Sequence, residues 1–179
     1  LPLSLANDTR ITNPYFMGNL ILFPTLNGKV IIISSTNNES VKNISVDPDS
    51  EFNNIISLNV IESSQTLIVA TPNKIVSISP KEVLSKDYEV RDIIINKEDI
   101  YVATIDGQLI KLSASLNEVK SKKYKYAKFH ALAFTDSLYA VESQGFLVNI
   151  NSDFSKDSVY DFSFDNEERM IAIGNKVYF

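Results

Sequence analysis

One short pattern recurs along the chain and restricts what it can fold into. Its clearest copy, residues 100–112, has an apolar run that ends at Thr104, then Asp106-Gly107 and a second apolar run. Asp-Gly and Asn-Gly pairs readily adopt the positive φ angles of tight hairpin turns, and a lone Asn, as at Asn73 and Asn175, tolerates them better than most residues. We therefore predict a β-hairpin here and in four similar segments, residues 20–33, 67–78, 138–150 and 170–179.

The hairpins recur often enough to mark a structural repeat. The positions equivalent to Thr104 lie 32 to 46 residues apart; they are Thr25, Thr71, Thr104, Glu142 and Gly174. Apolar segments rich in branched side chains, such as 54–60 and 91–96, precede the hairpins and favour strands. More polar, alternating segments, such as 41–46 and 118–126, follow them. Each repeat is therefore predicted to contain four strands, in the order apolar, apolar, mixed and polar.

A four-stranded unit at this spacing is typical of a β-propeller blade, because propeller repeats run to about 40–50 residues. A parallel β-helix would need a shorter period, and an immunoglobulin-like sandwich would not repeat one hairpin five times. The length of 179 residues fits one domain of roughly 100 to 200 residues. We predict an all-β propeller domain or propeller segment over residues 1–179, built of four-stranded antiparallel blades. Its four full repeats and partial fifth are approximately 11–46, 54–90, 91–127, 129–160 and 160–179.

Composition removes most kinds of chemistry from consideration. The chain has no Cys and a single His, which excludes disulfides, thiolate metal sites, Cys nucleophiles and zinc sites that need two imidazoles. Its net charge of −5 disfavours nucleic acid as a partner, because sequence-independent binding depends on basic groups that neutralise phosphates. We therefore assign no catalytic, cofactor-binding or metal-binding residue, and we expect no cofactor.

Two features could still carry chemistry. His130 lies in an apolar segment, where its imidazole could line a central channel as an acid or base or serve as a hydrogen-bonded core residue. Carboxylates gather at 47–51 and 165–168 and could bind calcium, although neither segment has the spacing of a twelve-residue calcium loop. We expect both carboxylate segments to be solvated turns between strands.

A basic segment is the candidate for partner binding. It contains five lysines with two tyrosines between them; the lysines are Lys120, Lys122, Lys123, Lys125 and Lys128. Such a segment could bind an acidic partner, an anionic lipid surface or single-stranded nucleic acid. Alternatively, it could be an outermost strand that its lysines protect from pairing, with Tyr124 and Tyr126 on one face and Lys123 and Lys125 on the other.

The repeats also resemble a known family. Residues 13–31 and 91–112 are similar to the repeats of pyrroloquinoline-quinone-like propellers, and within them to the BamB-type lipoproteins of bacterial outer-membrane assembly. The chain has no Trp, however, and so lacks the docking motif that quinone-dependent dehydrogenases share. The resemblance implies a non-enzymatic scaffold for protein–protein interaction at the periplasmic face of the outer membrane. Its partners would be other proteins, including outer-membrane assembly components, and a lipid anchor upstream of this chain would be its only link to the membrane.

Two alternatives stay open at this point. The first is a small-ligand-binding, quinone-dependent or metal-dependent propeller enzyme with its site at the channel mouth. The second concerns ring closure: members of the resembling family are longer, which favours a C-terminal arc of a larger propeller, whereas an outer strand from residues 1–10 would close a five-bladed ring. An arc would leave exposed sheet edges, through which two copies could associate.

Overall fold

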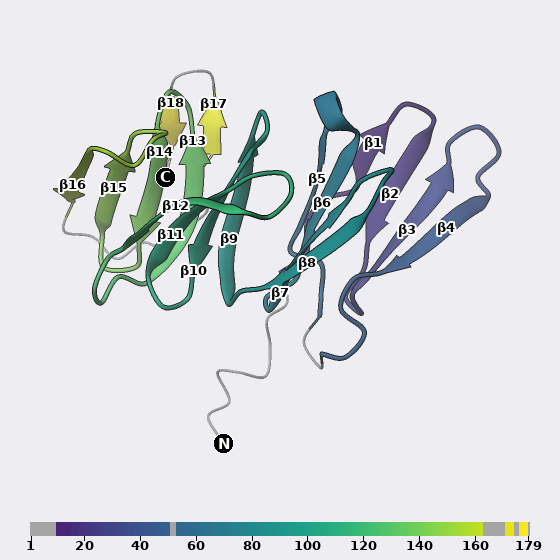
Figure 1. The fold of residues 1–179 in the computed structure, drawn as a ribbon, viewed down its shortest axis with the longest axis horizontal. Helices are drawn as coiled ribbons and strands as arrows, with labels where there is room; N and C mark the ends of the chain where they lie inside the picture. Colours follow the sequence, from purple (N-terminus) through teal and green to yellow (C-terminus); the bar gives the residue numbers. More distant parts are fainter. Residues whose placement is uncertain (1–9, 51–52, 163–170, 174–175, 179) are drawn as a thin grey trace. The chain divides into compact units, whose positions relative to one another are not determined.

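The computed structural model describes residues 10–50, 53–162, 171–173 and 176–178, and these form eighteen strands (Figure 1). The strands make four four-stranded antiparallel sheets and one two-stranded sheet. The chain divides into two compact units, Leu1–Tyr88 and Glu89–Phe179. Among the described residues, no helix is long and apolar enough to cross a membrane.

The first unit contains two sheets, each a meander of four consecutive strands. The strands of the first sheet are β1 (Tyr15–Met17), β2 (Leu20–Pro24), β3 (Lys29–Ser34) and β4 (Ser40–Ser45). Those of the second sheet are β5 (Ser57–Ile61), β6 (Thr66–Ala70), β7 (Lys74–Ile78) and β8 (Val83–Asp87), with a 3₁₀ turn, η2 (Glu62–Ser64), between β5 and β6.

The second unit repeats the arrangement. The strands of the third sheet are β9 (Val90–Asn96), β10 (Asp99–Thr104), β11 (Gln108–Leu112) and β12 (Glu118–Lys123). Those of the fourth sheet are β13 (Phe129–Phe134), β14 (Leu138–Glu142), β15 (Phe146–Ile150) and β16 (Asp157–Asp161), and a last hairpin joins β17 (Ile171–Ile173) to β18 (Lys176–Tyr178). The predicted four-stranded antiparallel blades are confirmed. A closed five-bladed ring would need an outer strand from residues 1–10. Residues 1–9 lie outside the described part of the chain, so ring closure stays a prediction.

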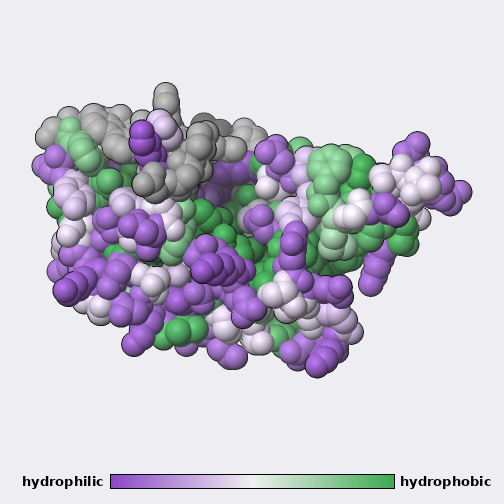
Figure 2. All heavy atoms as spheres, turned by 90° about the horizontal axis from the view of Figure 1, so that it is seen from above, coloured by the Kyte–Doolittle hydropathy of each residue, from purple (hydrophilic) through white to green (hydrophobic). Residues whose placement is uncertain are grey.

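Burial is greatest in the second strand of each sheet and least in the fourth; the predicted polar outer strand is therefore observed, but the first strand is less buried than the second. All five residues of β6 are buried, and so are five of the six in β10, whereas β8 alternates between exposed and half-buried residues. An inner strand packs both faces against neighbours, while an outermost strand covers one face only. Figure 2 shows mostly hydrophilic side chains on the surface that it views, with hydrophobic patches between them.

Each unit has its own apolar core between its two four-stranded sheets. In the first unit, Leu22 and Val30 of the first sheet join Leu58 and Val69 of the second. In the second unit, Tyr101 and Leu109 of the third sheet pack with residues of the fourth, among them Phe129, Leu138 and Ile150. Burying a large apolar side chain fully contributes about 1.5–3 kcal/mol, so these cores supply most of the driving force for stacking the sheets.

The recurring Thr closes the hairpin turn. Thr104 Oγ1 accepts a hydrogen bond from the Gln108 amide (3.0 Å) and donates one to the Asp106 carboxylate. Thr25 likewise accepts from the Lys29 amide (2.9 Å). One side-chain oxygen thus satisfies a backbone N–H that the turn leaves without a partner, which explains why the sequence repeats Thr at this position.

The Asn-containing turn differs from its prediction. Asn73 does not have a positive φ, and the prediction that it substitutes for Gly in the left-handed region is wrong. Two residues separate Thr71 from its paired residue Lys74, one fewer than separate Thr104 from Gln108. Thr71 Oγ1 accepts from the amides of both Asn73 (3.3 Å) and Lys74 (3.1 Å). Asn175 lies outside the described residues.

Only glycine fits at position 107, because the backbone has a positive φ and a Cβ there would collide with neighbouring backbone atoms. Its φ is +84°, and a Cβ built there would lie 2.5 Å from the Ala127 carbonyl oxygen and 2.8 Å from that of Tyr124. Gly18 provides a contrast, because its φ is +56° but a Cβ there would meet nothing within 4 Å.

We expect Gly107→Ala to lower the free energy of unfolding by about 3 kcal/mol, because it adds a backbone clash to the cost of a positive φ. Gly18→Ala should cost only about 1 kcal/mol, since it carries the conformational cost alone. Urea unfolding followed by circular dichroism measures both. Equal losses for the two variants would contradict the packing argument.

Candidate protein-interaction face

Three backbone segments meet at one end of the third and fourth sheets. They are the β10–β11 turn (105–107), the β12–β13 connection (124–128) and the β14–β15 turn (143–145), which together we call the end face (Figure 1). The Tyr124 amide donates to the Gly107 carbonyl (2.9 Å), and the Ser143 amide donates to the Lys128 carbonyl (3.0 Å). These bonds tie the three segments into one surface.

The basic segment is split between a strand and this connection. β12 ends at Lys123, and the Tyr124 ring turns inward, edge-on to Phe129 with ring centroids 5.7 Å apart. Tyr126, by contrast, is 83% exposed. The prediction that Tyr124 and Tyr126 share one face of a continuous strand is therefore wrong, because the strand stops before the alternation can reach them.

The five lysines of the basic segment differ in whether they form ion pairs. Lys122 Nζ lies 2.7 Å from Asp157 Oδ1 of the fourth sheet, and Lys123 forms an ion pair with Asp106 in the β10–β11 turn. Within the described part of the chain, the other three have no carboxylate at ion-pair distance; they are Lys120, Lys125 and Lys128. The basic character of the end face therefore comes from Lys125 and Lys128.

Asp157 also accepts a hydrogen bond from the Tyr124 hydroxyl (2.9 Å). The hydrogen bond from Lys122, followed by that from Tyr124, holds the pKa of the Asp157 carboxyl below its ordinary value, against the effect of burial. Burial and the neighbouring Asp157 carboxylate raise the pKa of Tyr124. The phenol thus stays protonated and donates to a carboxylate that stays ionised, which links the outer strands of two sheets.

The buried Glu142 side chain holds the end of the β12–β13 connection in place. It stands where three of the other hairpins have Thr, and it is only 4% exposed. Its carboxylate accepts from the Gln144 amide within the turn (2.8 Å), two residues on, whereas Thr25 and Thr104 accept from the amide four residues on; it also accepts from the Lys128 amide (3.0 Å). The second bond ties the connection to the fourth sheet. Glu in a Thr position was visible in the sequence, but its link to Lys128 was not predicted.

Tyr126 adopts a backbone conformation that its side chain does not favour. Its φ is +71°, in the left-handed region, which costs a residue other than Gly, Asn or Asp roughly 1–2 kcal/mol. The Lys125 ammonium lies over its ring, 4.9 Å from the centroid. Ile105 of the neighbouring turn is 55% exposed. The end face therefore presents two large exposed side chains on a hydrogen-bonded frame, and the sequence did not single out either of them as exposed.

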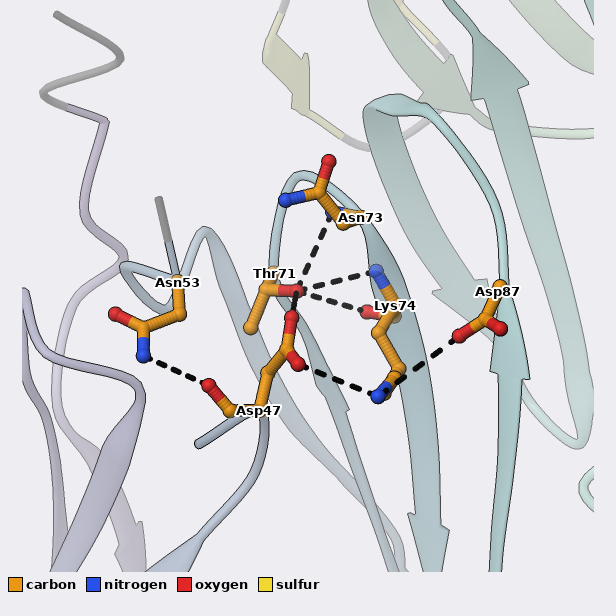
Figure 3. A network of polar contacts seen from close by, with 6 residues as sticks. All are labelled: Asp47, Asn53, Thr71, Asn73, Lys74 and Asp87. Atoms are coloured by element: carbon orange, nitrogen blue, oxygen red, sulfur yellow. Dashed lines mark hydrogen bonds and ion pairs between the residues drawn. The ribbon is translucent and has the colours of Figure 1, made fainter. Parts of the chain in front are cut away.

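The acidic segment 47–51 contains a buried charge, contrary to prediction (Figure 3). Asp47 is 1% exposed, and its carboxylate lies 3.2 Å from Lys74 Nζ and accepts from Thr71 Oγ1 (3.3 Å). Its backbone carbonyl accepts from Asn53 Nδ2 (2.7 Å). The expectation of a solvated turn is wrong for Asp47, because Lys74 of the second sheet neutralises it. The other acidic segment, 165–168, lies outside the described residues.

His130 connects the first strands of the third and fourth sheets, β9 and β13. Its Nδ1 lies 2.6 Å from Nη2 of Arg91, which places β9 beside β13. Because a guanidinium can only donate, the ring nitrogen is the acceptor. Nearby, Asp92 accepts from the Leu132 amide (2.6 Å). Among the described residues, no three His, Asp or Glu side chains gather closely enough to hold a metal ion.

Comparison with known proteins supports the propeller architecture. No family model matches the chain, so membership of the pyrroloquinoline-quinone-like repeat family remains a prediction. BamB from Moraxella catarrhalis superposes with a TM-score of 0.71 at 10% identity, covering 96% of this chain and 55% of BamB. The computationally designed protein Ika8 gives 0.73 at 13% identity, with the same coverages. KlHsv2 with loop 6CD replaced by a Gly-Ser linker gives 0.65 at 11% identity over 84% of this chain and 52% of that one. The chain therefore has a BamB-like β-propeller fold.

Curated relatives are similar in sequence. The chain is 29% identical over 161 residues to plasminogen-binding protein PgbB of Helicobacter pylori strain J99, and 29% identical over 160 residues to PgbB of strain 26695. Each match covers 88% of this chain but 29% of the relative. The chain thus spans less than a third of the length of the curated relatives it matches.

We expect Asp47→Asn to lower the free energy of unfolding by about 2 kcal/mol, because it leaves Lys74 without its closest partner; the partial exposure of Lys74 reduces the cost from that of a fully buried pair. Asp49→Asn is the matched control, since Asp49 is exposed in the same connection. Thermal melting and urea unfolding compare the two variants. If Asp47→Asn lowers the free energy of unfolding no more than Asp49→Asn does, the Asp47–Lys74 pair adds no stability.

The lowered pKa of Asp157 predicts that the stability of the fold depends on pH. Because its folded-state pKa is lowered, its contribution is present above the ordinary carboxyl value of 3.8 and is lost as the pH falls through the folded-state pKa. Asp157→Asn should lower stability at pH 7 by about 0.5–1 kcal/mol, and the difference from wild type should shrink below about pH 4. Urea unfolding at several pH values, with a double-mutant cycle through Lys122→Gln, measures this. A difference that stays constant into acid would contradict it.

Proposed function

We propose that the chain is part of a non-enzymatic, protein-binding β-propeller of a bacterial cell envelope, and that the end face of its second unit contacts the partner. The observation that carries the proposal is the end face itself. Its segments are fixed to one another by backbone hydrogen bonds, yet it exposes Ile105 and Tyr126 to solvent. Large side chains on a rigid frame are typical anchors of protein interfaces, because little conformational entropy is lost when they bind.

The similar proteins support the same class of function. PgbB carries the name of a plasminogen-binding protein, and we propose plasminogen as a partner of this chain. The BamB-like fold supports a place in the envelope. From the resemblance to BamB-type lipoproteins we further propose the periplasmic face of the outer membrane as the location, a lipid anchor upstream of this chain, and outer-membrane assembly components as additional partners.

We expect immobilised chain to bind purified plasminogen saturably at physiological salt, with a Kd of about 10 µM or lower as measured by biolayer interferometry. Ile105→Asp should weaken binding by about tenfold or more, because it places a charge among the anchoring contacts. Val159→Asp is the matched control: Val159 is also 55% exposed but lies on the outer strand β16. It should leave the affinity unchanged.

Two results would contradict this proposal. Absence of plasminogen binding by the wild-type chain would remove plasminogen as a partner, and equal weakening by the two Asp substitutions would remove the end face as the contact surface. A rise in melting temperature with pyrroloquinoline quinone and calcium would favour the enzyme alternative, because a ligand that binds the folded state raises its apparent stability.

A further inference from the structure

We propose that the β12–β13 connection, residues 124–128, is a preformed clamp for a short acidic segment of a partner protein. Tyr126 would pack against an apolar side chain of that segment, and Lys125 and Lys128 would pair with its carboxylates. The inference rests on the proposed function and adds to it the residues that bind and the chemistry they recognise.

The conformation of Tyr126 is the first observation. Its ring is 83% exposed and packs into neither apolar core, although its backbone lies in a region where Gly or Asn would be less strained. An unfavourable backbone conformation that gains nothing from internal packing is characteristic of functional loops. The ring is available to a partner, with the Lys125 ammonium 4.9 Å from its centroid.

The distribution of charge is the second observation. Asp157 and Asp106 neutralise the lysines at the end of β12, Lys122 and Lys123. Lys125 and Lys128 flank Tyr126, are exposed, and have no carboxylate at ion-pair distance in the described residues. The chain as a whole is acidic, with a net charge of −5. A local cationic pair beside an aromatic ring is therefore complementary to carboxylates next to an apolar group.

The third observation is how firmly the connection is held. The Tyr124 amide bonds to Gly107 at its start, and the Ala127 amide bonds back to the Tyr124 carbonyl (3.1 Å). At its end, the Lys128 amide bonds to the buried Glu142 carboxylate (3.0 Å). A loop fixed at both ends loses little entropy on binding, which raises the affinity of a small contact surface.

A protein segment fits these observations better than an extended polyanion. Nucleic acid and anionic membranes are bound through many basic groups at once, and each phosphate contact adds a similar increment. Among the described residues, two lysines of the connection have no carboxylate at ion-pair distance, and Asp106 lies at its edge. A short acidic segment can contact this small surface without meeting the negative charge of the rest of the chain.

The test uses a fluorescein-labelled synthetic peptide with acidic residues on both sides of a single Phe, titrated with the chain and followed by fluorescence anisotropy. A control peptide carries Asn and Gln in place of the acidic residues. We expect the acidic peptide to bind, the amide peptide to bind at least about tenfold more weakly, and the affinity for the acidic peptide to fall as salt is raised.

Four variants assign the binding to the connection. Tyr126→Asn and the double variant Lys125→Gln/Lys128→Gln should each weaken peptide binding about tenfold or more. Tyr126→Asn should melt no lower than wild type, because Asn suits a positive φ. Glu142→Thr introduces the residue that three of the other hairpins have, and so keeps the turn closed while removing the Lys128 anchor. It should weaken binding without touching a contact residue. The double variant Lys81→Gln/Lys156→Gln, an equal charge change at two exposed lysines outside the connection, should have no effect.

Several outcomes would overturn the inference. They are equal binding of the two peptides, unchanged affinity in the Tyr126 and lysine variants, or binding of phosphatidylglycerol vesicles or an oligothymidylate without binding of the acidic peptide. Plasminogen binding by the wild-type chain separates the two proposals. If plasminogen binds wild type and Tyr126→Asn equally and the peptide does not bind, the proposed function stands and this inference fails; if the peptide binds and plasminogen does not, plasminogen is the wrong partner and the clamp remains.

Discussion

The apolar strands of each unit have to be covered by a second sheet, and the rest of the structure depends on this constraint. β6 and β10 consist almost entirely of buried residues, and each packs in a core that its sheet shares with the other four-stranded sheet of the same unit. No helix covers them in the described part of the chain, and the units meet the requirement by stacking one four-stranded sheet on the next. Stacking in turn brings hairpin turns and connections of adjacent sheets together at the same end.

Polar contacts between sheets are built on this stacking. Asp47 with Lys74 in the first unit, and Asp157 with Lys122 and Tyr124 in the second, each join groups from consecutive repeats. Apolar packing supplies most of the free energy, and these contacts neutralise charged groups where the sheets meet. Glu142 extends the same principle to a loop and turns a flexible connection into a defined surface.

Much of the fold could be predicted from local pattern. Thr104 with Asp106-Gly107 indicated a hairpin because turn chemistry depends on residues that are close in sequence. The same reasoning failed for Asn73, where removal of one residue changes the turn geometry, and for Tyr126, where β12 ends before the alternation is complete. In both cases the length of the segment, set by contacts with other strands, decided the conformation.

The candidate site was predictable only in part. The sequence indicated that lysines and tyrosines are concentrated between residues 120 and 128. It did not indicate that two of the lysines are neutralised, because Asp106 and Asp157 come from the neighbouring turn and the next sheet. Nor did it show that Asp47 is buried, since its partner Lys74 belongs to the following repeat.

The amino-acid sequence by itself determined the repeat, the four-stranded unit and the order of buried and exposed strands, because these follow from side-chain periodicity and from turns of a few residues. Only the tertiary structure decided which charges are neutralised, that Glu142 anchors the connection and that Tyr126 faces solvent. Lys122 and Asp157 lie 35 residues apart in the chain and meet only when one sheet packs on the next. Glu142 with Lys128, and Lys123 with Asp106, meet only when the strands and turns of one sheet are assembled.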